Sequence, residues 1–460
     1  MRVFMLGWEF PPFISGGLGT ACYGLTKAMS SIGTDIMFVL PRPVSTPFST
    51  HVRLVSPRPG SPLASPTAEF RLDEFEHVTF RTVNAALSPY NTPADYQQQQ
   101  GTRETSVTKT KAAGAAAAEP SPESMQAVGH KPGIVAGAPA AGSPYGGDLF
   151  AEIQRYALLS TEIARNETFE VVHAHDWMTF PAGLAVAAMK NVPLIVHVHS
   201  TEFDRSGANI DQRIYDIERR GMHGAMKVIA VSYLTKNQVT HQYGVDPSKV
   251  EVVYNAIEQN GNGNGNDYDQ EKYSIHKDEK IVLFLGRITM QKGPEYFLAA
   301  AKKVLEVMDN VKFVMAGSGD MIRRTIEMAA AMGIGHKVLF TGFLRGGDVE
   351  KVFRMADLYV MPSVSEPFGI APLEAMSHDV PVIISKQSGV SEVLTHALKV
   401  DFWDVNEMAN KIVAVLKHPP LASMLREHGS FEVRRLHWVD AARQCVQIYG
   451  QARAMVNGKG

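Results

Sequence analysis

The sequence predicts an α/β protein built from two doubly wound parallel sheets. Short apolar runs alternate with amphipathic segments over most of the 460 residues, and strand–helix–strand alternation of this kind requires right-handed crossovers in a parallel sheet. The alternation occurs in two blocks, separated by the Gly/Asn-rich stretch QNGNGNGNDYDQ at 259–270. Because such sheets bind ligands at the carboxyl ends of their strands, two similar domains predict a ligand site between those edges.

The first block starts with the apolar run RVFMLG, which predicts a buried strand. Apolar residues then recur with helical spacing over 18–32 (Leu18, Cys22, Leu25, Met29). A second helix is predicted at 150–166. The remaining strands are predicted at 36–40, 170–175, 193–199, 227–232 and 250–256. The intervening segment 92–148 is rich in Ala, Gly, Pro, Ser and Gln, so we expect a disordered insertion there.

The second block contains five apolar runs in regular alternation with helices. These runs are KIVLFLG, VKFVMAG, KVLFTG, DLYVMP and PVIIS, between residues 280 and 385. The block ends before LHWVDAARQCVQIYGQARAM, which predicts a closing amphipathic helix.

Composition excludes several classes of partner. The formal charge of −2 gives no reason to expect nucleic acid or an anionic membrane. The two cysteines, Cys22 and Cys445, lie too far apart in sequence for a zinc motif and are too few for a disulfide framework, so we expect a cytoplasmic protein. No stretch approaches the ~18–20 apolar residues of a membrane helix, and the sequence is silent on oligomeric state.

The loops after the strands of the second block carry candidate ligand-binding residues. Arg287 and Lys292 follow its first strand, where two cations could neutralise a diphosphate. Gly317 follows the second strand and could admit a ligand close to the backbone. Phe343 and Leu344 follow the third and could form an apolar wall for a flat ring. Each of these motifs also has an ordinary structural explanation that fits about as well. Arg287 and Lys292 could be surface cations of a solvated loop, and Gly317 part of a strand-to-helix turn. Phe343 and Leu344 could belong to a core strand and its turn.

The stretch SVSEPFGIAPLEAM at 363–376 is more informative. A helix that begins near Gly369 and Ile370 offers amides to an anion. Glu366 would lie in the preceding loop and Glu374 in the first turns, where each carboxylate could accept hydrogen bonds from sugar hydroxyls. Helix-dipole complementation alone explains Glu374, but it does not explain Glu366.

Four histidines, His173, His175, His197 and His199, form two His-x-His pairs at the ends of two strands. Each pair lies on one strand face, so a zinc site is an alternative to hydrogen-bonded structural histidines. The loop SGGLGT resembles a dinucleotide-binding turn but lacks its Gly-x-Gly-x-x-Gly spacing, which argues against a dehydrogenase.

Taken together, these motifs resemble those of retaining GT-B glycosyltransferases, in particular glycosyltransferase family 4 with features of bacterial glycogen and starch synthases. The motif EPFGIAPLE resembles the family's paired glutamates. The motif GRITMQKG resembles its donor-phosphate segment. The stretches WEFPPFISGGLGT and VVHAHDW resemble its acceptor-side glycine loop and its histidine motif. The resemblance covers nearly the whole chain outside 92–148 and 259–270.

The resemblance implies a role for each matching residue. Arg287 and Lys292 would hold the donor diphosphate, Glu374 the ribose, and Glu366 the transferred sugar. The amides near Gly369 and Ile370 would meet sugar or phosphate, Gly16 and Gly17 would approach the phosphates or the acceptor, and His175 would contact the donor sugar near the reacting carbon. The leaving phosphate itself would take the acceptor proton. The resemblance is to metal-independent enzymes, so we expect neither a metal ion nor a cofactor, with the nucleotide sugar as substrate.

The resemblance also implies the domain plan. An acceptor-side domain would span 1–258, a linker 259–272 and a nucleotide-sugar domain 273–432, with 433–460 crossing back to the first domain. ADP-glucose or UDP-glucose and an α-1,4-glucan are the expected substrates. Ser15 stands where one bacterial glycogen synthase family carries lysine, so a lipid, small-sugar or cell-surface acceptor stays open, as does a non-catalytic nucleotide-sugar-binding protein.

Overall fold

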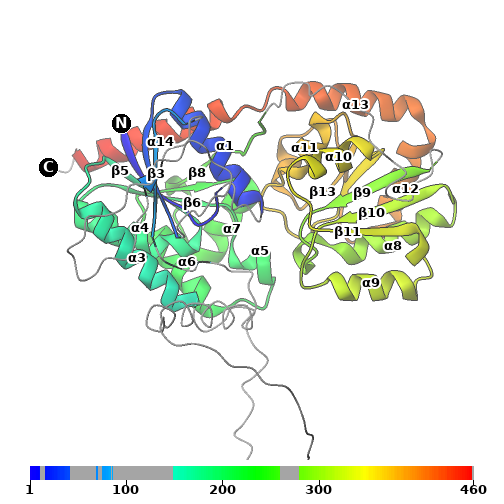
Figure 1. The fold of residues 1–460 in the computed structure, drawn as a ribbon, viewed down its shortest axis with the longest axis horizontal. Coiled ribbons are helices and arrows are strands. Elements are labelled where there is room, and N and C mark those ends of the chain that lie inside the picture. The colour runs from blue at the N-terminus through cyan, green and yellow to red at the C-terminus, as the bar shows by residue number, and fades with distance from the viewer. Residues whose placement is uncertain are drawn as a thin grey trace, which may run out of the picture.

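The structure is a computed structural model that describes residues 1–10, 16–41, 69–70, 75–83, 85, 87, 149–258 and 279–457. The predicted insertion at 92–148 and the predicted linker at 259–272 lie outside the described residues, as does Ser15. Two lobes, each a sheet flanked by helices, lie side by side (Figure 1).

The described part of the first lobe contains an eight-stranded sheet in the order β3-β4-β2-β1-β5-β6-β7-β8. All neighbouring strands are parallel except β3 and β4, which pair antiparallel. The strands are β1 (Arg2–Leu6), β2 (Asp35–Leu40), β3 (Glu69–Phe70), β4 (Val78–Thr82), β5 (Val171–His175), β6 (Leu194–Val198), β7 (Lys227–Ala230) and β8 (Val250–Val252).

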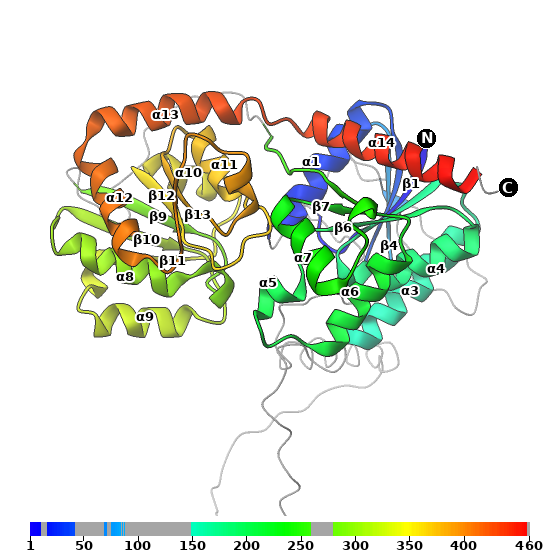
Figure 2. The ribbon, with the colours of Figure 1, turned by 180° about the vertical axis from the view of Figure 1, so that it is seen from behind.

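Helices cover both faces of this sheet (Figure 2). The alternate side chains of β1 and β2 explain the two layers: Val3 and Phe38 pack in the core with α1 and α14, whereas Phe4 and Val39 pack in the core with α3, α4 and α6. The helices and 3₁₀ turns are α1 (Gly17–Ser31), α3 (Leu149–Arg165), η1 (Trp177–Thr179), α4 (Phe180–Lys190), α5 (Glu202–Ser206), α6 (Gln212–Gly224), α7 (Tyr233–Tyr243), η2 (Pro247–Lys249) and α14 (Trp438–Asn457).

The second lobe contains a six-stranded parallel sheet in the order β11-β10-β9-β12-β13-β14. Its strands are β9 (Lys280–Leu285), β10 (Val311–Ala316), β11 (Val338–Gly342), β12 (Leu358–Met361), β13 (Val382–Ser385) and β14 (Leu398–Val400). Its helices and turns are η4 (Met290–Lys292), α8 (Pro294–Leu305), α9 (Ile322–Ala331), η5 (Gly335–Lys337), α10 (Gly347–Met355), α11 (Ala371–Ser377), η6 (Gly389–Glu392), α12 (Val405–Lys417) and α13 (Pro419–Val433).

The predicted fold class is confirmed, since both lobes are parallel-sheet α/β units. Sequence reasoning missed three strands, β3, β4 and β14. Two of these, β3 and β14, are only two and three residues long, and β4 carries three polar residues among its five, Thr79, Arg81 and Thr82. Short or polar runs at the margins of a sheet lack the continuous apolar signal of a central parallel strand.

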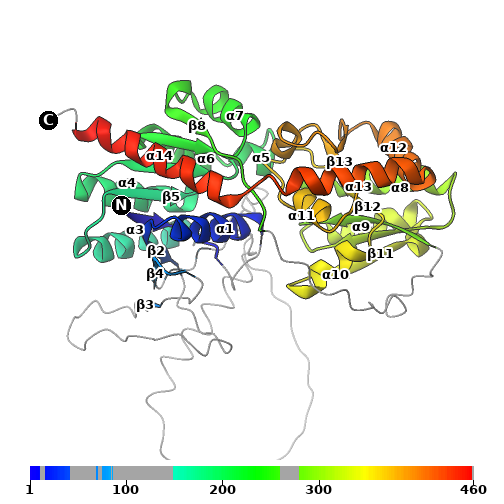
Figure 3. The same ribbon diagram turned by 90° about the horizontal axis from the view of Figure 1, so that it is seen from above.

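The chain leaves the second lobe through α13 and ends in α14, which lies along α1 on the first lobe (Figure 3). Trp438, at the start of α14, is 7% exposed and packs on Gly24 of α1. Further along the helix, the Tyr449 hydroxyl lies 2.5 Å from Nδ1 of His173 on β5. The end of the chain is thereby packed into the first lobe.

Among the described residues, none of the helices combines the length and the apolar character needed to cross a membrane.

The contact between α1 and α14 predicts that Gly24→Ala destabilises the protein. A Cβ at this position would lie 2.2 Å from the Trp438 indole nitrogen, and overpacking of this kind costs about 1–3 kcal/mol of unfolding free energy. Gly450→Ala on α14 is the matched control, because a Cβ there meets no atom within 4 Å and alanine favours a helix by up to ~1 kcal/mol. Denaturant unfolding of both variants measures the difference, and equal stability of the two would show that α14 does not pack this way.

Candidate active site

Most of the predicted site residues follow strands at the two points where strand order reverses, whereas Gly317 follows β10, and Phe343 and Leu344 follow β11. In the second sheet β9 lies between β10 and β12; in the first, β1 lies between β2 and β5. Loops diverge to opposite faces at such points and leave room for a ligand at the carboxyl ends of the strands. Arg287 and Lys292 follow β9 and Glu366 follows β12, whereas Gly16 follows β1 and His175 ends β5.

The loop that carries Arg287 passes very close to two glycines of the loop after β10. A Cβ on Gly317, whose φ is +142°, would lie 1.8 Å from the carbonyl oxygen of Gly286, and a Cβ on Gly319 would lie 2.3 Å from that of Ile288. The Ile288 amide donates to the Ser318 carbonyl at 2.9 Å. Gly317 therefore admits the neighbouring loop of its own chain, and by doing so it positions Arg287.

Lys292 and Glu366 form a direct ion pair at the β9–β12 switch point. The Lys292 ammonium lies 2.5 Å from Oε2 of Glu366, and the Ser363 hydroxyl donates to the same oxygen at 3.1 Å. The side chains are 20% and 9% exposed. A carboxylate this buried requires its cation, because an unpaired buried charge costs several kcal/mol.

Gly369, Ile370 and Glu374 surround this pair. Gly369 has a φ of +100°, which a side chain rarely adopts, and a Cβ there would lie 3.1 Å from Cγ of Glu366. Ile370 precedes α11 as its N-cap, and Glu374 lies in the first turn. Burial raises the pKa of Glu374 to about 7, and no donor among the described residues contacts its carboxylate.

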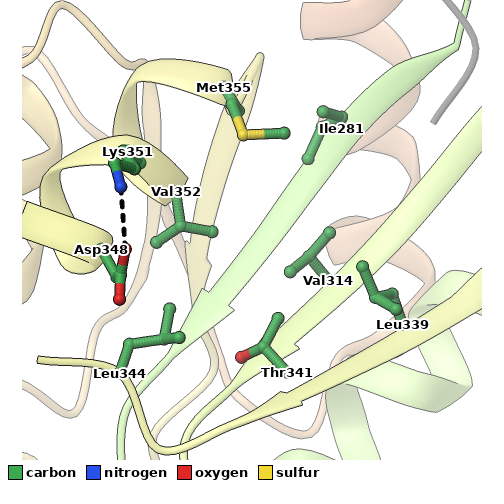
Figure 4. A pocket seen from close by; sticks show the side chains of 9 residues that line it. All are labelled: Ile281, Val314, Leu339, Thr341, Leu344, Asp348, Lys351, Val352 and Met355. Atoms are coloured by element: carbon green, nitrogen blue, oxygen red, sulfur yellow. Dashed lines mark hydrogen bonds and ion pairs between the residues drawn. The ribbon is translucent and has the colours of Figure 1, made fainter. Parts of the chain in front are cut away.

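Phe343 and Leu344, which follow β11, have different surroundings. The Phe343 ring is 47% exposed and lies 5.1 Å from the Arg345 guanidinium. Leu344 instead lines a pocket between the sheet and α10 (Figure 4). The other lining residues are Ile281, Val314, Leu339, Thr341, Asp348, Lys351, Val352 and Met355. Phe343 is thus available for stacking, whereas Leu344 faces a mainly apolar pocket under a helix.

At the first-lobe switch point, Glu9 accompanies the predicted glycines. Gly17 begins α1 and is exposed, with no atom within 4 Å of its missing Cβ. The Glu9 carboxylate, only 3% exposed, accepts a hydrogen bond from the Gly19 amide at 3.1 Å. A carboxyl group therefore already accepts a hydrogen bond from the first turn of α1.

His175 belongs to a cluster of four imidazoles. Because β5 and β6 are parallel, His175 pairs in register with His197, at 5.2 Å between the ring centroids. Along each strand the rings stack in pairs, His173 on His175 at 4.3 Å and His197 on His199 at 4.2 Å, so the four rings form two stacked pairs side by side. Nδ1 of His175 lies 2.9 Å from Nε2 of His199. His175 is fully buried, and His199 is the partly exposed member. A bound sugar would therefore meet His199 before His175.

Burial keeps these rings neutral. Desolvation lowers the pKa of His175 to about 3 and also lowers the pKa of His173, His197 and His199. Desolvation raises the pKa of the neighbouring Asp176 to about 7, although its Oδ1 accepts the His199 amide at 2.7 Å.

Hydrogen bonds between strand-end loops join the two halves of the site. The Ser365 hydroxyl donates to Asp204 of α5 at 2.6 Å, directly beside Glu366, and the Ser232 hydroxyl donates to the Pro367 carbonyl at 2.6 Å. The Glu392 carboxylate accepts the first two amides of α7, at 2.8 Å and 2.7 Å. Sequence reasoning missed Asp204 and Glu392. The capping pattern from Thr201 to Asp204 could have indicated α5 but not its partner across the site.

Family comparisons agree with this arrangement. The family described as "Glycosyltransferase Family 4" matches residues 116–260, and that described as "Glycosyl transferases group 1" matches residues 266–430. An uncharacterized glycosyltransferase of Methanocaldococcus jannaschii is 33% identical over 307 residues, which are 63% of this chain and 77% of the relative. A glycogen synthase of Mycobacterium tuberculosis is 23% identical over 462 residues, 98% of this chain and 95% of the relative.

Solved structures share the fold at low identity. Sucrose-phosphate synthase from Thermosynechococcus elongatus has a TM-score of 0.68 at 18% identity, over 99% of this chain and all of that one. The catalytic domain of starch synthase IV from Arabidopsis thaliana, bound to ADP and acarbose, has a TM-score of 0.66 at 14% identity, over 98% and 99% of the two chains. The chain belongs to the family 4 and group 1 glycosyltransferases and is an enzyme with the GT-B fold.

Proposed function

We propose that this enzyme transfers glucose from ADP-glucose or UDP-glucose to an α-1,4-glucan, with retention of the anomeric configuration. The observation that carries the proposal is the Lys292–Glu366 pair at the β9–β12 switch point. Ser365, the residue before Glu366, donates a hydrogen bond to Asp204 of the first lobe. A cation for phosphate and a carboxylate for sugar hydroxyls lie there in direct contact. The full-length similarity to a glycogen synthase supports the substrate class.

In this proposal the donor lies along the carboxyl edge of the second sheet. Arg287 and Lys292 bind the diphosphate, and Glu374 accepts hydrogen bonds from the ribose hydroxyls. Glu366 and the amides near Gly369 bind the transferred sugar. When phosphate oxygens approach Lys292, its ammonium, which has three protons to donate, bridges them and Glu366.

The chemistry needs no basic side chain. The bond between the anomeric carbon and the leaving phosphate oxygen breaks, the acceptor oxygen bonds to the same face of that carbon, and the acceptor proton passes to the leaving phosphate. Arg287 and Lys292 stabilise the negative charge that grows on the phosphate. His175 is neutral, and in the proposal it acts as a hydrogen-bonding group toward the sugar, not as a counter-ion.

The first-lobe switch point favours a neutral acceptor. Glu9 places a carboxylate at the start of α1, close to Gly16. A carboxylate accepts hydrogen bonds from hydroxyl groups and repels a phosphorylated acceptor. A glucan end, which presents only hydroxyls, meets this requirement next to Gly16 and Gly17.

Nucleotide release tests the substrates. We expect release from ADP-glucose or UDP-glucose that depends on added glycogen, and a new glucosidic bond of α configuration by proton NMR of an oligosaccharide product. GDP-mannose and UDP-N-acetylglucosamine serve as donor controls. Release that does not respond to glycogen with any donor would move the acceptor to another class, and a β product would overturn retention.

Removal of either phosphate-binding cation is expected to lower turnover more than donor affinity. Arg287→Ala and Lys292→Ala should each reduce kcat about 10²–10³-fold, because their charge matters most as the phosphate leaves. Arg323→Ala is the matched control, since that side chain is 90% exposed and pairs with Glu327 within one helix. Wild-type kcat in both cation variants would refute the phosphate assignment.

Glu374→Gln is expected to weaken donor binding but to raise the stability of the donor-free protein at high pH. Burial raises the pKa of Glu374 from 4.5 to about 7. Between these two pKa values the folded protein therefore binds a proton that the unfolded chain has lost. Its stability falls as the pH rises across this range. Without donor, the Tm of the variant should be about 1–3 °C higher than that of wild type at pH 8, and the two Tm values should be equal at pH 4.5. It should also bind the donor nucleotide more weakly. A Tm difference that does not change with pH would show that folding does not shift the pKa of Glu374.

A further inference from the structure

The cluster of four imidazoles holds donor atoms that the proposed transfer does not use. Ligand atoms from His173, His175 and His197 lie within 4.8 Å of one another, and so do those of Cys22, His175 and His199. His173, His175, His197 and Cys22 are at most 1% exposed. Two overlapping groups of three soft donors thus share the ring of His175.

Each of the four rings keeps at least one buried nitrogen without a hydrogen-bond partner among the described residues. For His197 both nitrogens are in this state, and for His173 and His175 it is Nε2. Buried polar atoms are nearly always partnered, and an unpartnered one costs about 1–3 kcal/mol. A cluster of several such atoms, aimed into one small region, points to a ligand that accepts their lone pairs.

The chemistry of the donors selects a borderline or soft cation. Imidazole nitrogen and cysteine sulfur suit Zn²⁺, Cu²⁺ and Ni²⁺, whereas Mg²⁺ and Ca²⁺ require oxygen ligands. A divalent charge in a buried site also needs compensation. In the proposal the carboxylate of Asp176 supplies it, since this residue follows His175 directly and its Oδ1 accepts the His199 amide at 2.7 Å.

Zinc binding would require the rings to move. Tetrahedral zinc binds imidazole at about 2.0–2.1 Å, which places two ligand nitrogens about 3.4 Å apart. The ligand atoms here lie within 4.8 Å of one another and the rings are stacked, with 23° between the planes of His173 and His175. In the proposal the rings turn about their terminal side-chain torsion, which is soft, so that their lone pairs meet at the ion.

We propose that His173, His175 and His197 bind one Zn²⁺, or a similar borderline divalent cation, with a solvent or sulfur ligand in the fourth position. The ion takes the free nitrogen of His175 and so removes that ring from the sugar. Zinc at this site therefore inhibits glucosyl transfer. The inhibitory part rests on the proposed function, whereas the binding part does not.

A titration of the chelator-treated full-length protein with Zn²⁺, against a chromophoric competitor, tests the binding. We expect one tight site per chain, with an affinity at least about tenfold lower in His197→Asn. His241→Asn is the matched control, because His241 is exposed on α7 and contacts only its own helix. Its zinc affinity and its activity should equal those of wild type.

Two results would overturn the site: no stoichiometric uptake of Zn²⁺, or uptake that His197→Asn leaves unchanged. If that variant fails to fold, X-ray absorption of zinc-loaded wild type decides instead, since the site requires imidazole nitrogens at about 2.0–2.1 Å and an all-oxygen shell refutes it. In the transfer assay Zn²⁺ should inhibit and Mg²⁺ should not. Zinc binding without inhibition would refute the link to His175, and absence of any transfer activity would leave the titration as the test of the site.

Discussion

The reversal of strand order in each parallel sheet is the constraint on which the rest of the structure depends. In the second sheet it separates the loops after β9 and β12, and in the first it separates those after β1 and β5. Both gaps open at the carboxyl edge of their sheet. The interlobe hydrogen bonds described above join the loop after β12 and Glu392 to the segments after β6 and β7, so they hold Glu366 next to the first lobe.

Glycines allow neighbouring loops of the second-lobe half of this site to approach each other closely. Gly317 and Gly319 let the loop after β9 cross the loop after β10 at a distance that no side chain permits. Gly317 and Gly319 thereby fix the course of the loop that carries Arg287. A side chain at Gly317 would clash with the Gly286 carbonyl and displace that loop. Gly369 is required for a different reason, since its φ of +100° is one that a side chain rarely adopts, and a Cβ there would lie 3.1 Å from Cγ of Glu366.

Much of the fold and part of the site could be predicted from the sequence because their signals are local. Central strands are continuous apolar runs, and Lys292 and Glu366 stand in short motifs beside such runs. What the sequence could not give depends on register and on distant partners. His175 and His197 pair because β5 and β6 align at those residues, and no local pattern fixes that alignment. The partners of Asp204 and Glu392 lie 161 and 158–159 residues away, so no spacing rule could connect them.

Burial gives the first-lobe half of the site a different electrostatic character from the second. The second lobe offers permanent cations and carboxylates, which suit a charged donor. In the first lobe desolvation keeps the stacked imidazoles neutral, and neutral imidazole is a weak partner for phosphate but a good one for a hydroxyl or a metal ion. The two proposals for His175 both rest on this neutrality. A neutral ring can hydrogen-bond to an uncharged sugar, and the same ring can bind a zinc ion, so the two ligands would compete for it.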